Sequence, residues 1–382
     1  MAAGRRTRIL IVDDSAVMRS LLRSVVCADA GLEVAGTAAD GESALRSIEV
    51  LRPDLILLDV EMPVMDGLIT LRQLRTRGHR MPVIMCSSLT QRGAKVTIEA
   101  LACGASDYVT KPEGQASREA ATRALAQELV PRIHALTSQL QGQPKGQPQS
   151  VFPGAARMPL MLPMAPAHKA QPVSSVPVVL AIGVSTGGPA ALEVLLPALS
   201  GNFPLPVLIV QHMPELFTKL FAERLDGRCR LRVREAAEGD PVRAGTIYIA
   251  RGNWHMEVVG AARAGRPATL HLNQGPLENH CRPAVDALFR TAAGVYGSGV
   301  LAVVLTGMGS DGLAGCRTIR DNGGSVLAQD QATSTVWGMP GAVTNAGLAH
   351  NVLPLNAMAP EILRIASRTH GSEARELLKS VV

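Results

Sequence analysis

Short apolar runs alternate with amphipathic stretches along the first third of the chain. Five of these runs are expected to be β-strands, at residues 9–12, 32–37, 55–58, 83–86 and 107–109. Helical patterns fill the gaps between them, so this segment predicts a parallel sheet with helices on both faces. In such sheets, ligands bind beyond the carboxyl ends of the strands.

Polar residues stand at four of these strand ends. Asp13 and Asp14 follow the first run, Asp59 the third, Ser87 the fourth and Lys111 the fifth. Three carboxylates at one edge repel each other unless a divalent cation neutralises them, and oxygen ligands suit Mg²⁺. Asp59 is then a nucleophile toward a phosphodonor, and Lys111 and Ser87 contact the transferred phosphoryl group. A single Asp would be read as a helix cap, but the ordered set favours a phosphorylation site.

Residues 6–130 closely resemble a response-regulator receiver domain. The motifs that carry the resemblance are Val-Asp-Asp-Ser at 12–15, Asp-Val-Glu-Met-Pro-Val-Met-Asp-Gly at 59–67, Ser-Ser-Leu-Thr at 87–90 and Asp-Tyr-Val-Thr-Lys-Pro at 107–112. The resemblance implies a flavodoxin-like fold and a CheA-type histidine kinase as phosphodonor.

The same resemblance assigns roles to individual residues. It implies that Asp59 is the phosphoacceptor and that Asp13, Asp14 and Asp59 hold Mg²⁺ with the backbone carbonyl of Glu61. It also implies that Ser87 and Tyr108 form a switch pair, that Lys111 contacts the phosphoryl group, and that Lys111–Pro112 is a cis peptide.

A segment rich in Pro, Gln, Gly, Ser and Met separates the two halves of the chain, from about residue 139 to 177. Its prolines disfavour a continuous helix and favour extended backbone. We therefore expect a linker at 131–172, between domains at 6–130 and 173–368, and a C-terminal tail at 369–382. A simple tether is favoured over a binding motif.

The second half begins with another predicted strand, at residues 178–182, and the turn Gly-Val-Ser-Thr-Gly-Gly at 183–188. Pro189 indicates that a helix starts there. Glycines permit the sharp turn, expose the Ser185 hydroxyl and leave backbone N–H groups free for an oxyanion. A phosphate-binding loop is the alternative, but neither Gly-Lys-Ser/Thr nor Gly-x-Gly-x-x-Gly is present, which favours a serine hydrolase.

A serine nucleophile needs a base and an orienting carboxylate at the same sheet edge. His212 follows the predicted strand at 207–210, and Asp311 follows the one at 300–305. Asp311 would hold His212 in one tautomer and stabilise its imidazolium. Asp286 and Asp330 are weaker alternatives for the orienting carboxylate. The remaining histidines of this half are expected to be surface or supporting groups, with His255 beside the cleft; they are His255, His271, His280 and His350.

The order Ser, His, Asp differs from the Ser, Asp, His order of α/β-hydrolases and disfavours that fold. Residues 173–368 instead resemble the catalytic domain of the chemotaxis protein-glutamate methylesterase family. The matching motifs are Ile-Gly-Val-Ser-Thr-Gly-Gly-Pro at 182–189, Val-Gln-His-Met-Pro at 210–214, Tyr-Ile-Ala at 248–250, Arg-Pro-Ala-Val-Asp-Ala-Leu-Phe at 282–289 and Leu-Thr-Gly-Met-Gly-Ser-Asp-Gly at 305–312. The fold class expected is α/β, with two doubly wound parallel-sheet domains, the second Rossmann-like.

This resemblance implies hydrolysis of glutamate γ-methyl esters on methyl-accepting chemoreceptors, with release of methanol, and deamidation of certain receptor glutamines. It implies Ser185 as nucleophile, His212 as general base and acid, and Asp311 as orienting group. The backbone of Met308 would contribute to the oxyanion hole, and Thr186 would position His212. We expect Mg²⁺ for phosphorylation, no cofactor for ester hydrolysis, and a receiver that covers Ser185 until it is phosphorylated.

Composition argues against several other classes of protein. The formal charge is +6, but Lys and Arg are scattered, so nucleic-acid binding is not expected, and no helix-turn-helix pattern supports a DNA-binding regulator. No apolar run reaches about 18 residues, the length that spans a bilayer, and six dispersed cysteines indicate neither a disulfide framework nor a zinc site. We expect a cytoplasmic monomer, recruited to membrane receptor arrays through partners. The competing class is a non-catalytic adaptor that docks on receptors.

Overall fold

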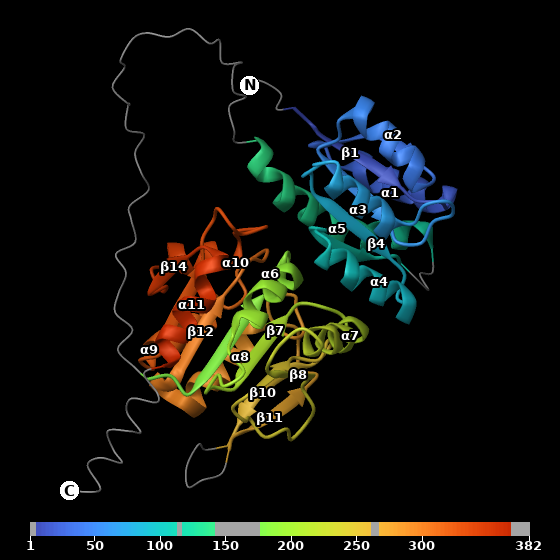
Figure 1. Ribbon diagram of the computed structural model, residues 1–382. Coiled ribbons are helices and arrows are strands. Elements are labelled where there is room, and N and C mark those ends of the chain that lie inside the picture. Colours follow the sequence, from blue (N-terminus) through green and yellow to red (C-terminus); the bar gives the residue numbers. More distant parts are fainter. Residues whose placement is uncertain (1–4, 113–116, 142–175, 261–266, 368–382) are drawn as a thin grey trace, which may run out of the picture.

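The computed structural model describes residues 5–112, 117–141, 176–260 and 267–367, which form two sheet-centred units (Figure 1). The first unit has a parallel five-stranded sheet in the order β2-β1-β3-β4-β5. Its elements are β1 (Thr7–Val12), α1 (Ala16–Ala28), β2 (Leu32–Ala38), α2 (Gly41–Leu51), β3 (Leu55–Asp59), α3 (Gly67–Thr76), β4 (Val83–Ser87), α4 (Gln91–Ala102), β5 (Asp107–Thr110) and α5 (Arg118–Gln141).

Both faces of the central strands β1, β3 and β4 are buried, which is why these strands read as nearly unbroken apolar runs. In β1, Ile9 and Ile11 pack with α1 and α5, whereas Leu10 and Val12 pack with α2, α3 and α4. The chain leaves β1 toward β2 on one side and returns to β3 on the other. Asp13 and Asp59 therefore lie at the switch point of the sheet, where doubly wound folds bind ligands.

The second unit has a parallel seven-stranded sheet in the order β14-β13-β12-β6-β7-β9-β8 and a separate antiparallel pair, β10 and β11. Its strands are β6 (Val179–Val184), β7 (Val207–Gln211), β8 (Arg232–Glu235), β9 (Thr246–Ile249), β10 (His255–Val259), β11 (Thr269–Asn273), β12 (Val300–Val304), β13 (Ser325–Gln329) and β14 (Asn351–Leu353). Its helices are α6 (Gly188–Leu195), α7 (Glu215–Asp226), α8 (Val285–Tyr296), α9 (Leu313–Asp321), α10 (Met339–Asn345) and α11 (Leu355–Ala366), with 3₁₀ turns η1 (Leu196–Ala198) and η2 (Gly297–Gly299).

The helices of the second unit divide between the two faces of its sheet. The apolar side chains of α6, α7 and α11 pack on one face. Those of α8, α9 and α10 pack on the other, together with β10 and β11. The α/β class and the parallel sheets predicted from the sequence are confirmed, and this arrangement brings the ends of β6, β7 and β12 together at the centre of one edge.

Two local expectations are wrong. The linker was predicted to begin at residue 131, but α5 continues to Gln141 with Pro131 inside it. Leu125, Leu129, Ile133 and Leu136 keep a helical spacing across Pro131 and pack against the sheet, which explains why the helix persists. The cis peptide in the described residues is Arg282–Pro283, so Lys111–Pro112 is trans. Most of the predicted linker, from 142 on, lies outside the described residues, as do the tail from 369 and residues 113–116.

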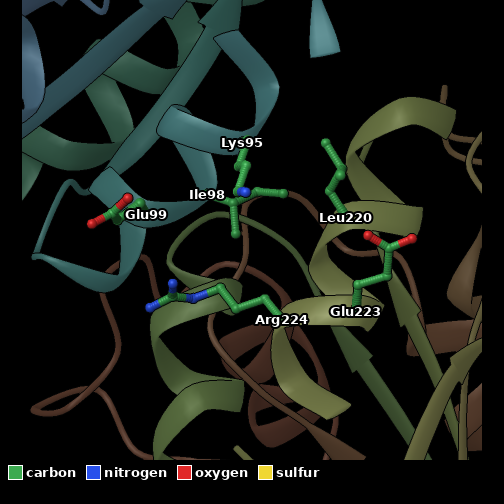
Figure 2. Close-up of a pocket in the computed structure, with 6 residues that line it drawn as sticks. All are labelled: Lys95, Ile98, Glu99, Leu220, Glu223 and Arg224. Carbon is green, nitrogen blue, oxygen red and sulfur yellow. The ribbon is translucent and has the colours of Figure 1, made fainter. Parts of the chain in front are cut away.

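The two units pack against each other through α4 of the first and α6 and α7 of the second. A groove of about 360 Å³ runs along this contact, lined by Lys95, Ile98 and Glu99 from α4 and by Leu220, Glu223 and Arg224 from α7 (Figure 2). No helix in the described ranges is both long enough and apolar enough to cross a membrane.

Candidate functional site

Ser185 lies in a sharp turn between β6 and α6, at the edge where β7 and β12 also end. Its N–H donates to the Thr306 carbonyl after β12, 3.0 Å away, and the side-chain amide of Gln211 donates to the Ser185 carbonyl at 3.0 Å. Gly187 adopts a positive φ of 77°, which starts α6 directly behind the serine. A Cβ at Gly307 would lie 2.9 Å from Ser185 Cβ, so only glycine leaves the serine room there. The half-buried Ser185 is thereby held between two neighbouring strand ends.

His212 follows β7 and pairs with Asp311, as the strand pattern predicts. The imidazole Nε2 lies 2.8 Å from Asp311 Oδ2, although the residues are far apart in the chain. Burial favours the neutral ring, but the Asp311 carboxylate and Cys281 outweigh that effect and raise the pKa of His212 to about 9. The backbone N–H of His212 donates to the Val184 carbonyl at 3.3 Å, which fixes the histidine beside the nucleophile turn.

Asp311 is almost fully buried and is held as a carboxylate by several donors. Its Oδ2 accepts from the Val285 N–H at 2.7 Å, and its Oδ1 accepts from the Asp286 and Gly312 N–H groups at 3.0 and 2.9 Å. The first two donors belong to the N-terminus of α8, which stabilises negative charge. Burial opposes ionisation, yet His212 and these N–H donors lower the pKa of Asp311. The site therefore has a fixed anion behind the imidazole.

The alternatives to His212 and Asp311 have other partners. Asp286 accepts from the Gly315 N–H, and Asp330 accepts from Thr333 at 3.0 Å, so neither contacts His212 in the described structure. His255 and His350 are buried and bond to backbone groups, whereas His271 and His280 are more exposed. Of the two expected placements, surface or supporting, His255 and His350 take the second, because both fill polar positions inside the second unit.

Thr186 has a different contact from the predicted one. Its hydroxyl donates to Asp107 Oδ2 of the first unit at 2.8 Å, not to His212. Arg132 donates to the same Asp107 oxygen at 2.8 Å. The residue beside the nucleophile is therefore tied to the other unit, which neither half of the sequence could indicate alone.

The acidic cluster predicted at the first sheet edge is present. Carboxylate oxygens of Asp13, Asp14 and Asp59 lie within 4.8 Å of one another. Lys111 Nζ lies 2.9 Å from Asp13 Oδ2 and 2.7 Å from Asp59 Oδ2. Burial and the neighbouring Asp13 raise the pKa of Asp59 to about 6, against the opposing effect of Lys111. The donor set consists of hard oxygens at one point, so it fits Mg²⁺, and Glu61 is adjacent, with its N–H 3.4 Å from Asp59 Oδ1.

The two residues of the predicted switch pair have different surroundings. Ser87 is buried, and its hydroxyl donates to the Ser88 carbonyl at 3.1 Å. The Tyr108 ring stacks on Phe217 of α7, with centroids 4.7 Å apart and planes 12° from parallel. Tyr108 therefore belongs to the contact between the two units, and its movement would change that contact.

Three residues near the serine were not identified from the sequence. Asn279 donates to Asp311 Oδ1 at 2.9 Å, Cys281 Sγ lies 3.6 Å from His212 Nδ1, and Asp107 holds Thr186. Asn279 and Cys281 stand just before the motif Arg-Pro-Ala-Val-Asp, and this position was the one sequence feature that could have indicated that they lie near the site. Asp107 is part of a receiver motif and carried no signal of a contact with the second unit.

Comparisons with known proteins agree with this arrangement. The response regulator receiver domain model matches residues 9–123, and the CheB methylesterase model matches residues 180–362. A "Protein-glutamate methylesterase/protein-glutamine glutaminase" from Nocardioides sp. is 48% identical over 96% of this chain and 97% of the relative. One from Trichodesmium erythraeum is 46% identical over 94% of this chain and 98% of the relative.

A solved CheB methylesterase catalytic domain from Thermotoga maritima is 40% identical and covers 50% of this chain and 98% of its own, with a TM-score of 0.48. The two family models and the two full-length relatives together account for both units of the chain in their observed order. The chain therefore belongs to the protein-glutamate methylesterase/protein-glutamine glutaminase family.

Proposed function

We propose that this chain hydrolyses glutamate γ-methyl esters on methyl-accepting chemoreceptors, releasing methanol, and deamidates certain receptor glutamines. The observation that carries the proposal is the pair of His212 and Asp311, 2.8 Å apart, at the sheet edge where the half-buried Ser185 lies. Both reactions act on a γ-carbonyl of a receptor side chain and differ in the leaving group. One serine site therefore serves both.

In the proposed mechanism, Ser185 Oγ attacks the γ-carbonyl carbon and His212 takes the hydroxyl proton. The His212 imidazolium then protonates the departing methoxide or amine, so that methanol or ammonia leaves and an acyl-enzyme remains on Ser185. Water, deprotonated by His212, attacks the acyl-enzyme and releases glutamate. Asp311 stabilises the imidazolium in both halves of the reaction.

Met308 is the proposed oxyanion donor. It lies in the turn after β12, next to Gly307, which approaches Ser185 closely. Among the described contacts, the Met308 N–H has no acceptor, so it is available to a developing oxyanion. Its side chain is more than a third exposed, which places it where a receptor helix would arrive.

Regulation is proposed to act through the contact between the units. Thr186, the neighbour of Ser185, bonds to Asp107, and Tyr108 stacks on Phe217, so the docked receiver occupies the approach to the serine. Phosphorylation of Asp59 adds charge beside Lys111 and Ser87 and would shift Tyr108, which weakens this contact. Mg²⁺ held by Asp13, Asp14, Asp59 and the Glu61 carbonyl would neutralise charge during phosphoryl transfer. A CheA-type histidine kinase is the proposed phosphodonor.

The substrate also sets the proposed location and partners. Chemoreceptor methylation sites lie on cytoplasmic helices, so the chain would act in the cytoplasm and reach membrane receptor arrays through the receptors. Two complete units in one chain supply both the switch and the serine site, which is consistent with action as a monomer. Ester hydrolysis by Ser185, His212 and Asp311 would need no cofactor.

Replacing Asp59 by Asn is expected to abolish activation. The amide cannot accept the phosphoryl group, so addition of a small phosphodonor and Mg²⁺ would leave methanol release at the basal rate. The measurement is the initial rate of methanol release with and without phosphodonor. Asp54→Asn, at a half-buried carboxylate paired with Arg5, is the matched control and should retain full activation. Normal activation of Asp59→Asn would contradict the proposed phosphoacceptor.

The basal rate should rise with pH. His212 must be neutral to accept the serine proton, and its raised pKa of about 9 means that the ring is mostly protonated at neutral pH. Between pH 7 and 9, kcat of the unphosphorylated chain should therefore increase about fifty-fold, and above pH 9 it should level off. A profile that levels off at pH 6.5, the ordinary value for a histidine, would show that Asp311 and Cys281 do not raise this pKa.

The reaction products distinguish a methylesterase and deamidase from a non-catalytic adaptor that only docks on receptors. Methylated receptor is incubated with the full chain, and mass spectrometry of receptor peptides follows conversion of methylglutamate and glutamine to glutamate. We expect both conversions, with methanol and ammonia released. Unchanged peptides in the presence and absence of phosphodonor would overturn the proposed enzyme and favour the adaptor.

A further inference from the structure

Both ring nitrogens of His212 have partners, and neither partner is Ser185. Nε2 lies 2.8 Å from Asp311 Oδ2, and Nδ1 lies 3.6 Å from Cys281 Sγ. A serine mechanism requires one nitrogen for the carboxylate and the other for the serine hydroxyl. Among the described contacts, no hydrogen bond joins Ser185 Oγ to the imidazole. The nitrogen that Ser185 needs therefore faces the thiol.

The segment that carries Cys281 is held in place by its backbone conformation and by hydrogen bonds. Asn279 and His280 have positive φ values of 50° and 63°, a conformation that costs energy in residues with side chains and persists only where the surroundings enforce it. Glu278 and Cys281 exchange backbone hydrogen bonds of 3.2 and 2.8 Å. Asn279 donates to Asp311 Oδ1 at 2.9 Å. The segment that carries the thiol is thus tied, through Asn279, to the same carboxylate that orients His212.

The thiol and the imidazole both line a cavity of about 330 Å³ between the units. The other titratable or charged groups that line it are Tyr108, Glu128, Arg132 and Arg282. Arg132 pairs with Asp107 and Glu128, and Arg282 bonds to Asn253. These charges have partners of their own, so Asp311 and Cys281 are the polar groups that hold the ring.

We propose that Cys281 is a positioning residue for His212, whose thiol holds the ring nitrogen opposite Asp311 and keeps it from Ser185 while the receiver is docked. This inference rests on the proposed function, in which Ser185 is the nucleophile and His212 the base. The basal rate is then set by competition between a thiol and a hydroxyl for one nitrogen. Cys281 itself forms no bond to the substrate.

The test compares the pH dependence of methanol release by the unphosphorylated full chain, its Cys281→Ala and Cys281→Ser variants, and Cys27→Ala, a control at an exposed cysteine of α1. In Cys281→Ala the midpoint of the plot of kcat against pH should fall by about one pH unit. As a result, kcat at pH 7 should rise about tenfold, with KM unchanged. Cys281→Ser keeps a hydrogen-bonding group and should retain most of the wild-type midpoint. Cys27→Ala should match the wild type.

A second measurement needs no substrate. NMR titration of the His212 ring in the full chain should give a lower pKa in Cys281→Ala than in the wild type. If no variant releases methanol, the proposed function fails, and the titration still decides whether Cys281 holds the ring. The inference would be overturned if Cys281→Ala had the same pH midpoint and the same His212 ring pKa as the wild type. It would also be overturned if this variant had a lower kcat at an unchanged pH midpoint.

Discussion

The Ser185→Ala variant is expected to release methanol at a rate lower by about 10⁴-fold or more, because no acyl-enzyme can form without the hydroxyl. The loss should fall on kcat, whereas KM stays close to the wild-type value, since the hydroxyl removed lies beside the γ-carbonyl of the substrate and not along the receptor helix. The turn itself should persist, because Ser185 contributes its N–H and carbonyl, not its hydroxyl, to the hydrogen bonds with Thr306 and Gln211.

Ser298→Ala is the matched control. Ser298 is exposed in η2, next to the start of β12 and therefore at the opposite edge of the sheet from Ser185. It should retain the wild-type rate. The comparison is made with initial rates of methanol release from methylated receptor in the presence of phosphodonor. Residual turnover in Ser185→Ala above one per cent of the wild-type rate would mean that another group is the nucleophile.

The Asp311→Asn variant is expected to lose about 10⁴-fold in kcat. The side chain keeps its size, but the charge that stabilises the His212 imidazolium is gone, and the amide can stabilise the wrong tautomer of the ring. Asp311 is buried and accepts hydrogen bonds from the Val285, Asp286 and Gly312 N–H groups. Among the described residues, no second carboxylate contacts His212. The midpoint of the pH profile should also fall, because Asp311 helps to raise the pKa of His212.

Asp330→Asn controls for this change, because Asp330 also lies at a strand end of the same sheet and was the weaker candidate by sequence. Its carboxylate bonds to Thr333 and should not affect the rate by more than about twofold. If Asp330→Asn and Asp311→Asn lost comparable activity, the assignment of Asp311 as the orienting group would be wrong. The same initial-rate measurement serves both variants.

The sequence predicted what depends on strand ends. Ser185, His212 and Asp311 each follow an apolar run, and parallel strands carry such residues to one edge whatever their separation in the chain. The acidic cluster of Asp13, Asp14 and Asp59 was predictable for the same reason. Both sheets were predictable from their central strands, such as β3, β6 and β12, which are buried on two faces and so carry mostly apolar residues.

Contacts that join segments without a shared periodic pattern could not be predicted. The Thr186–Asp107 bond depends on how the two units pack, and the position of Cys281 depends on two consecutive left-handed residues, Asn279 and His280. The end of α5 was missed because the linker was expected from residue 131, although the apolar spacing of the helix continues beyond Pro131. The Thr186–Asp107 bond and the position of Cys281 depend on tertiary packing, which composition and spacing do not encode directly.

The central claim is that phosphorylation of the receiver controls hydrolysis at Ser185. It is tested most directly by measuring methanol release from methylated receptor by the wild-type full chain, with and without a small phosphodonor and Mg²⁺, against Ser185→Ala as the blank. We predict release that rises when phosphodonor and Mg²⁺ are added together and that is absent from Ser185→Ala. Release that is the same with and without phosphodonor, or that persists in Ser185→Ala, would contradict the account.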